Sequence, residues 1–404
     1  MTTTSATSAP RVGAGISTLH DAASAARSAL DGALAPLGPE GPDLVFLFVS
    51  PQFEAEQRPI LDLVIERTGG AVVLGCSAGG VIGAGKEVED APAVSIWAAR
   101  LPGARIEPLR LTFAREEDHG IIEGFDPLPE ATEHPVVVLI ADPFTFPADL
   151  LLEHLNEAAP GVPVVGGMAS GGLERGRNAL FFDEEIVRDG AIGVVISGAV
   201  GLAAVVSQGC RPVGQTYAVT RAERNVVFEL GGQPAMSRIE EVYAASTERD
   251  QILMRRGLHI GQAVSELKPE LRRGDFLVRN LLGIDPETGA LAISDVAEVG
   301  QTVQFQVRDA EAAREDLSLL LERERAVRSE PVVGALLFSC NGRGQALFGQ
   351  PDHDVTAVRR TFGGVPVGGF FAAGELGPIA GRNFLHGFTA SLLLVRDGGA
   401  AQVR

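Results

Sequence analysis

The chain has 404 residues, which is too long for one ordinary hydrophobic core and predicts two or three domains. With 45% hydrophobic and 21% charged residues, its composition is that of a folded protein and excludes wholesale disorder. The formal net charge of -18 would repel phosphate backbones and anionic lipid, which argues against nucleic acid or a membrane surface as the main partner.

Cysteine usage and the N-terminus indicate the compartment. The three cysteines are far apart and form no CxxC pair, so neither a disulfide scaffold nor a zinc ribbon is indicated. The start, MTTTSATSAPRVGAG, lacks the regions of a signal peptide, and no stretch reaches the roughly 18 consecutive apolar residues of a spanning helix. We expect a cytoplasmic protein in which residues 1–10 are disordered.

In chain order, a strand and a helix come first, and one β-α-β-β unit follows them. VGAGIST (Val12 to Thr18) predicts a short strand, and the alanine-rich stretch after it predicts a helix. The unit itself is predicted from strand 43–49, helix 59–67, strand 71–74, a glycine turn and strand 93–99.

The same order recurs twice. The second copy is strand 135–140, helix 148–159, strand 162–165, turn and strand 191–197, and the third is 332–338, 353–362, 365–367, turn and 384–395. The three glycine segments read GAVVLGCSAGGVI, GVPVVGGMASGGL and GVPVGGFFAAGEL. A helical crossover between the first two strands of a copy predicts that those strands are parallel.

A different region separates the second and third copies. It is predicted to hold strands 212–220, 225–230, 276–284, 290–294 and 302–307 and helices 234–247 and 309–328. The predicted fold is α/β (α+β), with repeated β-α-β-β units forming mixed sheets flanked by helices. We expect two domains, 11–213 with two repeats and 214–404 with the antiparallel insert and the third repeat.

Six segments in the two halves of the chain form a recognisable set: VGAGIST, DLVFLFVS, GCSAGGVI, LLFSCNGRG, VPVGGFFAAGEL and NFLHGFT. They resemble the FIST family, bacterial proteins with paired FIST N and FIST C domains proposed to sense small ligands. The resemblance implies a FIST N-like domain over 11–213, a FIST C-like domain over 214–404 and a sensory role in signal transduction. Two positions depart from the family's pattern: Val81 stands where it usually carries an acid, and Gly387 where it favours asparagine.

Most of the candidate ligand-binding residues lie in the third copy, and two lie in the first. Glycine turns can expose backbone N–H groups to an anion, or can simply permit tight packing. Glu375, after Gly374, could bind an ammonium group or could be a solvated or capping acid, whereas Arg343 beside Asn341 could hold a carboxylate in two hydrogen bonds. Together Arg343 and Glu375 would suit a zwitterion such as an amino acid. The further candidates are Cys340, His386, Cys76 and Ser77.

A thiol enzyme is the alternative. Cys340 and Cys76 occupy positions where a nucleophile could be exposed, although cysteine also serves as a small buried residue. If His386 faced Cys340, it could act as the base of a hydrolase or transferase; otherwise it is a core histidine. No metal-ligand spacing is present, and GVIGAGKE ends in Glu87 where a P-loop needs a hydroxyl, so we expect neither a metal nor a cofactor.

The favoured interpretation is a stand-alone cytoplasmic sensor that binds a small metabolite and relays the bound state to a protein partner. It predicts a polar pocket lined by turn residues, whereas the enzyme requires Cys340 and His386 within hydrogen-bond reach. A third interpretation, a scaffold without a ligand, predicts a large apolar surface patch.

Overall fold

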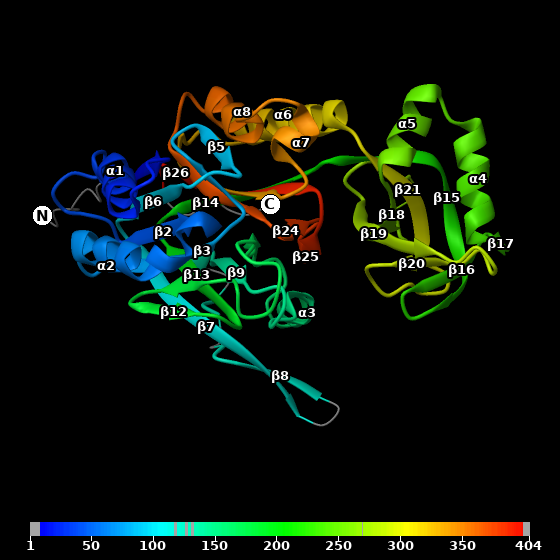
Figure 1. Ribbon diagram of the computed structural model, residues 1–404, viewed down its shortest axis with the longest axis horizontal. Helices are drawn as coiled ribbons and strands as arrows, with labels where there is room; N and C mark the ends of the chain where they lie inside the picture. The colour runs from blue at the N-terminus through cyan, green and yellow to red at the C-terminus, as the bar shows by residue number, and fades with distance from the viewer. Residues whose placement is uncertain (1–8, 117–118, 126–127, 131–132, 269, 399–404) are drawn as a thin grey trace, which may run out of the picture. The chain divides into compact units, whose positions relative to one another are not determined.

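The chain forms two compact units in a computed structural model that describes residues 9–116, 119–125, 128–130, 133–268 and 270–398 (Figure 1). Unit 1 comprises Met1–Val206, Leu317–Leu385 and Thr389–Arg404, and unit 2 comprises Ser207–Asp316 and His386–Phe388. The predicted mixed α/β class is confirmed. The boundary that we expect between the sequence domains 11–213 and 214–404 stays a prediction. Most of the expected disordered start, residues 1–8, lies outside the described residues.

Unit 1 contains the three predicted copies, each enlarged by elements that the sequence pattern did not reveal. The first copy consists of β1 (Arg11–Ser17), α1 (Ala22–Leu34), β2 (Leu44–Val49), η1 (Pro51–Glu56), α2 (Gln57–Thr68), β3 (Val72–Ser77), β4 (Gly80–Gly83), β5 (Lys86–Glu89) and β6 (Val94–Arg100). The second consists of β7 (Ala104–Glu116), β8 (His119–Glu123), β9 (Val136–Ala141), α3 (Ala148–Ala158), β10 (Val164–Met168), β11 (Leu180–Phe182), β12 (Glu185–Val187) and β13 (Ala191–Gly198).

The third copy is split by unit 2. It consists of β14 (Gly201–Gln208), α6 (Ala310–Val327), β22 (Val332–Cys340), α7 (Gly344–Phe348), α8 (His353–Thr361), β23 (Val367–Ala372), β24 (Glu375–Ile379), β25 (Arg382–His386) and β26 (Thr389–Arg396). The strand expected over 384–395 is therefore wrong, because the chain turns at Phe388, whose φ of 63° ends β25 before β26 begins.

The first two predicted strands of each copy are parallel, as expected: β2 with β3, β9 with β10, and β22 with β23. The hairpin that follows them leaves its own copy. β4 pairs with β23 of the third copy, β24 with β10 of the second, and β11 with β3 of the first. The exchange runs once around all three copies, so each sheet is completed by a hairpin from another copy.

The three sheets enclose one central core. The inward side chains of β2, β9 and β22, such as Phe46, Val138 and Phe338, belong to the same buried cluster. Their outward neighbours Leu47, Leu139 and Leu337 pack instead among the helices of their own copies. This alternation follows from the two-residue period of a strand, and it explains why these strands read as continuous apolar runs.

One glycine in each copy lets the parallel strands approach closely. A Cβ atom at Gly75, Gly166 or Gly369 would lie 1.8 Å from the carbonyl oxygen of the facing leucine on the neighbouring strand. These glycines lie inside β3, β10 and β23, not in turns as predicted, because the strands continue past them. Tight packing, not exposed N–H groups, is therefore the role of this glycine.

Unit 2 is a small antiparallel barrel. Its elements are β15 (Cys210–Glu223), β16 (Val226–Leu230), β17 (Gln233–Pro234), α4 (Ala235–Ala245), α5 (Glu248–Arg256), β18 (Leu258–Ala263), β19 (Phe276–Ile284), β20 (Leu291–Ile293) and β21 (Thr302–Arg308). The sheet closes because the long β15 pairs with β21 along its first part and with β16 along its last. The helix expected over 234–247 ends at Ala245, and Thr247 caps a new helix by accepting a hydrogen bond from Asp250 N.

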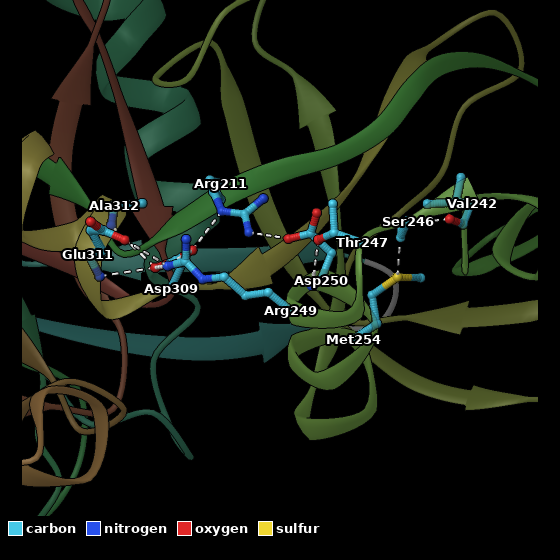
Figure 2. A network of polar contacts seen from close by, with 10 residues as sticks. All are labelled: Arg211, Val242, Ser246, Thr247, Arg249, Asp250, Met254, Asp309, Glu311 and Ala312. Atoms are coloured by element: carbon cyan, nitrogen blue, oxygen red, sulfur yellow. Dashed lines mark hydrogen bonds and ion pairs between the residues drawn. The ribbon is translucent and has the colours of Figure 1, made fainter. Parts of the chain in front are cut away.

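An ion-pair network stiffens this unit. Figure 2 shows Arg211 of β15 between Asp250 of α5 and Asp309, which precedes α6. Arg249 also reaches Asp309 at 3.0 Å and Glu311 at 2.9 Å.

Among the described residues no helix is long and apolar enough to cross a membrane.

Candidate functional site

A buried polar cluster lies at the carboxyl end of β22. The strand ends at Cys340, which is 8% exposed, and the chain continues through the exposed Asn341 to Arg343, which is fully buried. The Cys340 Sγ atom accepts a hydrogen bond from Gly342 N at 3.4 Å. The turn thus leads from the surface, at Asn341, to a buried cation within three residues.

Arg343 is held by Asp354 of α8. Its Nε donates to Asp354 Oδ2 at 2.7 Å and its Nη2 to Oδ1 at 2.8 Å. Ser339 Oγ donates to Oδ2 at 2.9 Å, and His353 Nδ1 lies 2.9 Å from Oδ1. Burial alone would raise the pKa of Asp354, but the charge and hydrogen bonds of Arg343 hold it well below its usual value. The two hydrogen bonds that we expected Arg343 to donate to a ligand carboxylate are donated to Asp354 instead.

Glu375, the first residue of β24, is the buried acid of the same cluster. Its Oε2 accepts hydrogen bonds from Thr389 N at 3.0 Å and Thr389 Oγ1 at 2.8 Å. Burial raises the pKa of Glu375 to about 8, although Thr389, the Cys340 thiol and the Arg343 charge act in the opposite direction. Cys340, Arg343 and Glu375, predicted as site residues from separate segments, thus interact in one place.

Two atoms of this cluster are buried without a partner. Within the described residues, neither Oε1 of Glu375 nor Nη1 of Arg343 has a hydrogen-bond partner. One is an oxygen that can accept, and the other is a nitrogen that donates. A buried polar atom left unpaired costs about 1–3 kcal/mol, so the cluster has a free energy to gain from any group that meets both atoms.

The other two copies have no such deficit at the equivalent position. Because Leu47, Leu139 and Leu337 face the equivalent glycines, Ser50, Asp142 and Cys340 are equivalent strand ends.

At these two ends the side chains are paired. Ser50 Oγ accepts from Ala93 N at 2.8 Å. Asp142 Oδ1 accepts from Asn178 Nδ2 at 2.8 Å, and its Oδ2 accepts from Thr145 Oγ1 at 2.6 Å. The third copy is thus distinct from the others.

Comparison with known proteins decides the family. The FIST N domain matches residues 43–233, and the FIST C domain matches residues 235–378. The chain belongs to the FIST family. FIST domains are generally sensory domains of signal transduction proteins.

The FIST chain has full-length relatives in mycobacteria. It is 45% identical over 387 residues to the uncharacterized protein Rv0628c of Mycobacterium tuberculosis, and the aligned region covers 96% of this chain and 100% of that protein. It is 43% identical to the uncharacterized protein Mb0898c of Mycobacterium bovis, over 96% of this chain and 99% of that protein. The uncharacterized protein MJ1623 of Methanocaldococcus jannaschii is 26% identical over 122 residues, which are 30% of this chain and 22% of that protein.

The predicted site residues of the FIST N half lie buried in β3. Cys76 is fully buried in β3, and burial raises the pKa of its thiol well above the usual value. Ser77 is also buried, and its Oγ accepts from Ala179 N at 2.9 Å. The glycine turns contact one another: Gly79 N donates to Ser170 Oγ at 3.0 Å, and Gly171 N donates to Ser77 O at 3.1 Å.

Two further predicted residues of the FIST C half, Gly374 and His386, lie directly before β24 and at the end of β25. Gly374 O accepts from Met168 N at 2.8 Å, which fixes the start of β24 on the edge of β10. His386 ends β25, is 4% exposed and belongs to unit 2, whereas Cys340 belongs to unit 1. The pairing of Cys340 with His386 stays a prediction.

Three residues of the cluster escaped sequence reasoning: Asp354, Thr389 and Glu87. Asp354 stands in the first turn of α8, where an acid is ordinary. Glu87 is buried, and its Oε1 accepts a hydrogen bond from Val355 N at 2.8 Å. Burial, together with the charge of Asp354, raises the pKa of Glu87 to about 8.

In the described part of the chain, no three His, Cys, Asp or Glu side chains are placed to hold a metal ion.

Proposed function

We propose that this FIST protein is a cytoplasmic sensor that binds a small polar metabolite at the Cys340–Arg343–Glu375 cluster and relays the bound state to a partner protein. One observation carries the proposal: Glu375 Oε1 and Arg343 Nη1 are buried and have no partner among the described residues. A ligand with a donor for the first atom and an acceptor for the second would remove both deficits.

An amino acid has this chemistry. Its carboxylate would accept from Arg343 Nη1, because Nε and Nη2 are occupied by Asp354, and its ammonium group would donate to Glu375. The exposed Asn341 and the half-buried Gly342 are the surface end of the cluster, so the ligand would enter past this turn.

Binding of an ammonium group should also release a proton. With its pKa at about 8, Glu375 is largely protonated at pH 7, and a nearby positive charge favours the carboxylate. The test is calorimetry at pH 7 in two buffers of different ionisation enthalpy, and the enthalpies should differ in proportion to the proton released. Equal enthalpies would exclude an ammonium ligand at Glu375.

The decisive experiment is a thermal-shift screen of amino acids and other small polar metabolites, since a ligand of the folded state raises the melting temperature by mass action. Glu375→Gln should weaken any hit by about tenfold or more, because one charge-assisted hydrogen bond is lost. Ser50→Ala, at the equivalent strand end of the first copy, is the matched control and should bind as the wild type does. A hit that Glu375→Gln leaves unchanged would refute the site, and no hit at all would favour the scaffold.

A thiol-dependent hydrolase or transferase is the second candidate. It is favoured by the Cys340 thiol, which interacts with Glu375 and accepts a hydrogen bond from Gly342 N. The ionised form of Glu375, which gains population as pH rises towards its pKa of about 8, could take the thiol proton. Rapid labelling of Cys340 by iodoacetamide, lost in Glu375→Gln, would support this chemistry; labelling no faster than at Cys76 would exclude it.

A further inference from the structure

One cavity lies in the second copy of unit 1. It has a volume of about 440 Å³ and is lined by none of the residues of the Cys340 cluster. One wall is β7, the second is the turn after β9, and the third is the loop after β10. The lining residues are Phe113, Arg115, Pro143, Phe144, Thr145, Phe146, Pro147 and Arg175.

Two arginines line this cavity. Arg115 and Arg175 are both exposed, and among the residues whose side chains the structure describes neither has an ion-pair or hydrogen-bond partner. No acidic side chain is among the described residues that line the cavity. In a chain of net charge -18, two arginines that line one cavity provide positive charge that would attract an anion.

The rest of the lining is apolar and aromatic. Phe144 is 43% exposed and Phe113 of β7 is half-buried, whereas Phe146, two residues after Phe144, is 3% exposed. Exposed aromatic faces are where a planar ring gains most from stacking. Apolar walls with a few charged groups are typical of small-molecule sites, and the volume lies within their usual range of roughly 300–1,000 Å³.

Two walls of the cavity are fixed in place by one buried pair. Asp142 and Asn178 are both fully buried and joined at 2.8 Å. Asp142 Oδ2 accepts from Thr145 Oγ1 at 2.6 Å, which holds the turn that carries Phe144. Asn178 Oδ1 accepts from Gly172 N at 2.7 Å, which closes the loop that carries Arg175. The site is thus organised before a ligand arrives, which reduces the entropy lost on binding.

We propose that this cavity binds a small aromatic anion, an aryl carboxylate or aryl phosphate. The anionic group pairs with Arg115 and Arg175, whose planar forks match a carboxylate or phosphate, and the ring packs on Phe113 and Phe144. This site is independent of the proposed function, because it shares no residue with the Cys340 cluster. The protein would then respond to two ligands of different chemistry.

The test uses phenyl phosphate as the probe, with phenol and inorganic phosphate as probes that each carry one half of its chemistry. Ligand-observed NMR titrations should show saturable binding of phenyl phosphate and at least about tenfold weaker binding of the other two. Arg175→Ala and Phe144→Ala should each weaken phenyl phosphate by about fivefold to tenfold. Arg27→Ala, which removes an exposed arginine on α1, is the matched control and should change nothing.

Since Arg175 and Phe144 are exposed, their variants should melt at the wild-type temperature, which separates lost binding from lost folding. The proposal is overturned if phenyl phosphate does not saturate, if Arg27→Ala weakens it as much as Arg175→Ala does, or if inorganic phosphate binds equally well. Capture of a phosphorylated peptide without binding of phenyl phosphate would also overturn it, in favour of protein docking.

Discussion

Replacing Asp354 by alanine should be among the most destabilising changes at the site. The substitution removes both hydrogen bonds to Arg343 and the acceptor of Ser339, and it leaves a guanidinium group that is 0% exposed without its ion-paired carboxylate. Removing one partner of a buried ion pair costs about 3–5 kcal/mol, because the remaining charge stays buried. We therefore expect the free energy of unfolding of unit 1 to fall by about 3–5 kcal/mol in Asp354→Ala.

Urea denaturation followed by tryptophan fluorescence measures this loss. Trp97 is the chain's single tryptophan and is buried in the core of unit 1, so its emission reports that unit and not the barrel. The double variant Arg343→Met, Asp354→Leu removes both charges and should lie within about 1–2 kcal/mol of the wild type. Asp62→Ala, which breaks the exposed Arg58–Asp62 pair on α2, should leave the midpoint unchanged. A loss in Asp354→Ala as small as in Asp62→Ala would refute the reasoning.

The remaining predictions concern pH and backbone packing. Glu375 and Glu87 keep pKa values of about 8 in the folded state against an ordinary 4.5, so the folded chain holds protons that the unfolded chain releases. The free energy of unfolding of unit 1 should therefore fall as pH rises from about 4.5 to 8, and Glu375→Gln should flatten this slope in urea titrations; an equal slope would contradict the raised pKa. Gly369→Ala should prevent folding of unit 1, because its Cβ would meet Leu337 O at 1.8 Å, whereas Gly283→Ala, which has open space, should be recovered as folded protein. Comparable yields and circular dichroism for the two variants would show that the strands can separate.

The repeat and its parallel strand pairs were predictable because they depend on local signals. Buried parallel strands give continuous apolar runs, such as LVFLFV in β2, and a helix between two of them fixes their direction. The exchange of hairpins among copies was not predictable. Strand β4 is only four residues long, and its partner β23 is far away in the sequence. No local property of GVIG specifies which sheet edge it joins.

The site was predicted in part for a similar reason. Arg343 and Glu375 were found because each stands beside glycines at a strand end, where a charged side chain is unusual. The partner of Arg343 was missed, because Asp354 looks like any acid in the first turn of a helix. Its position in the sequence could not show that Asp354 accepts hydrogen bonds from two nitrogens of the Arg343 guanidinium group. Because those two nitrogens are occupied, Arg343 can offer a ligand one nitrogen, Nη1, instead of two.

The proposed function requires a ligand site at the strand end of the third copy that the equivalent strand ends of the other two copies lack. Hydrogen–deuterium exchange with and without a ligand from the thermal-shift screen tests it most directly, because protection appears where the ligand orders the backbone. Exchange should slow at Gly342, Arg343 and Thr389 and stay unchanged at Ser50 and Asp142. Protection confined to the equivalent strand ends of the first two copies, or to neither, would contradict it.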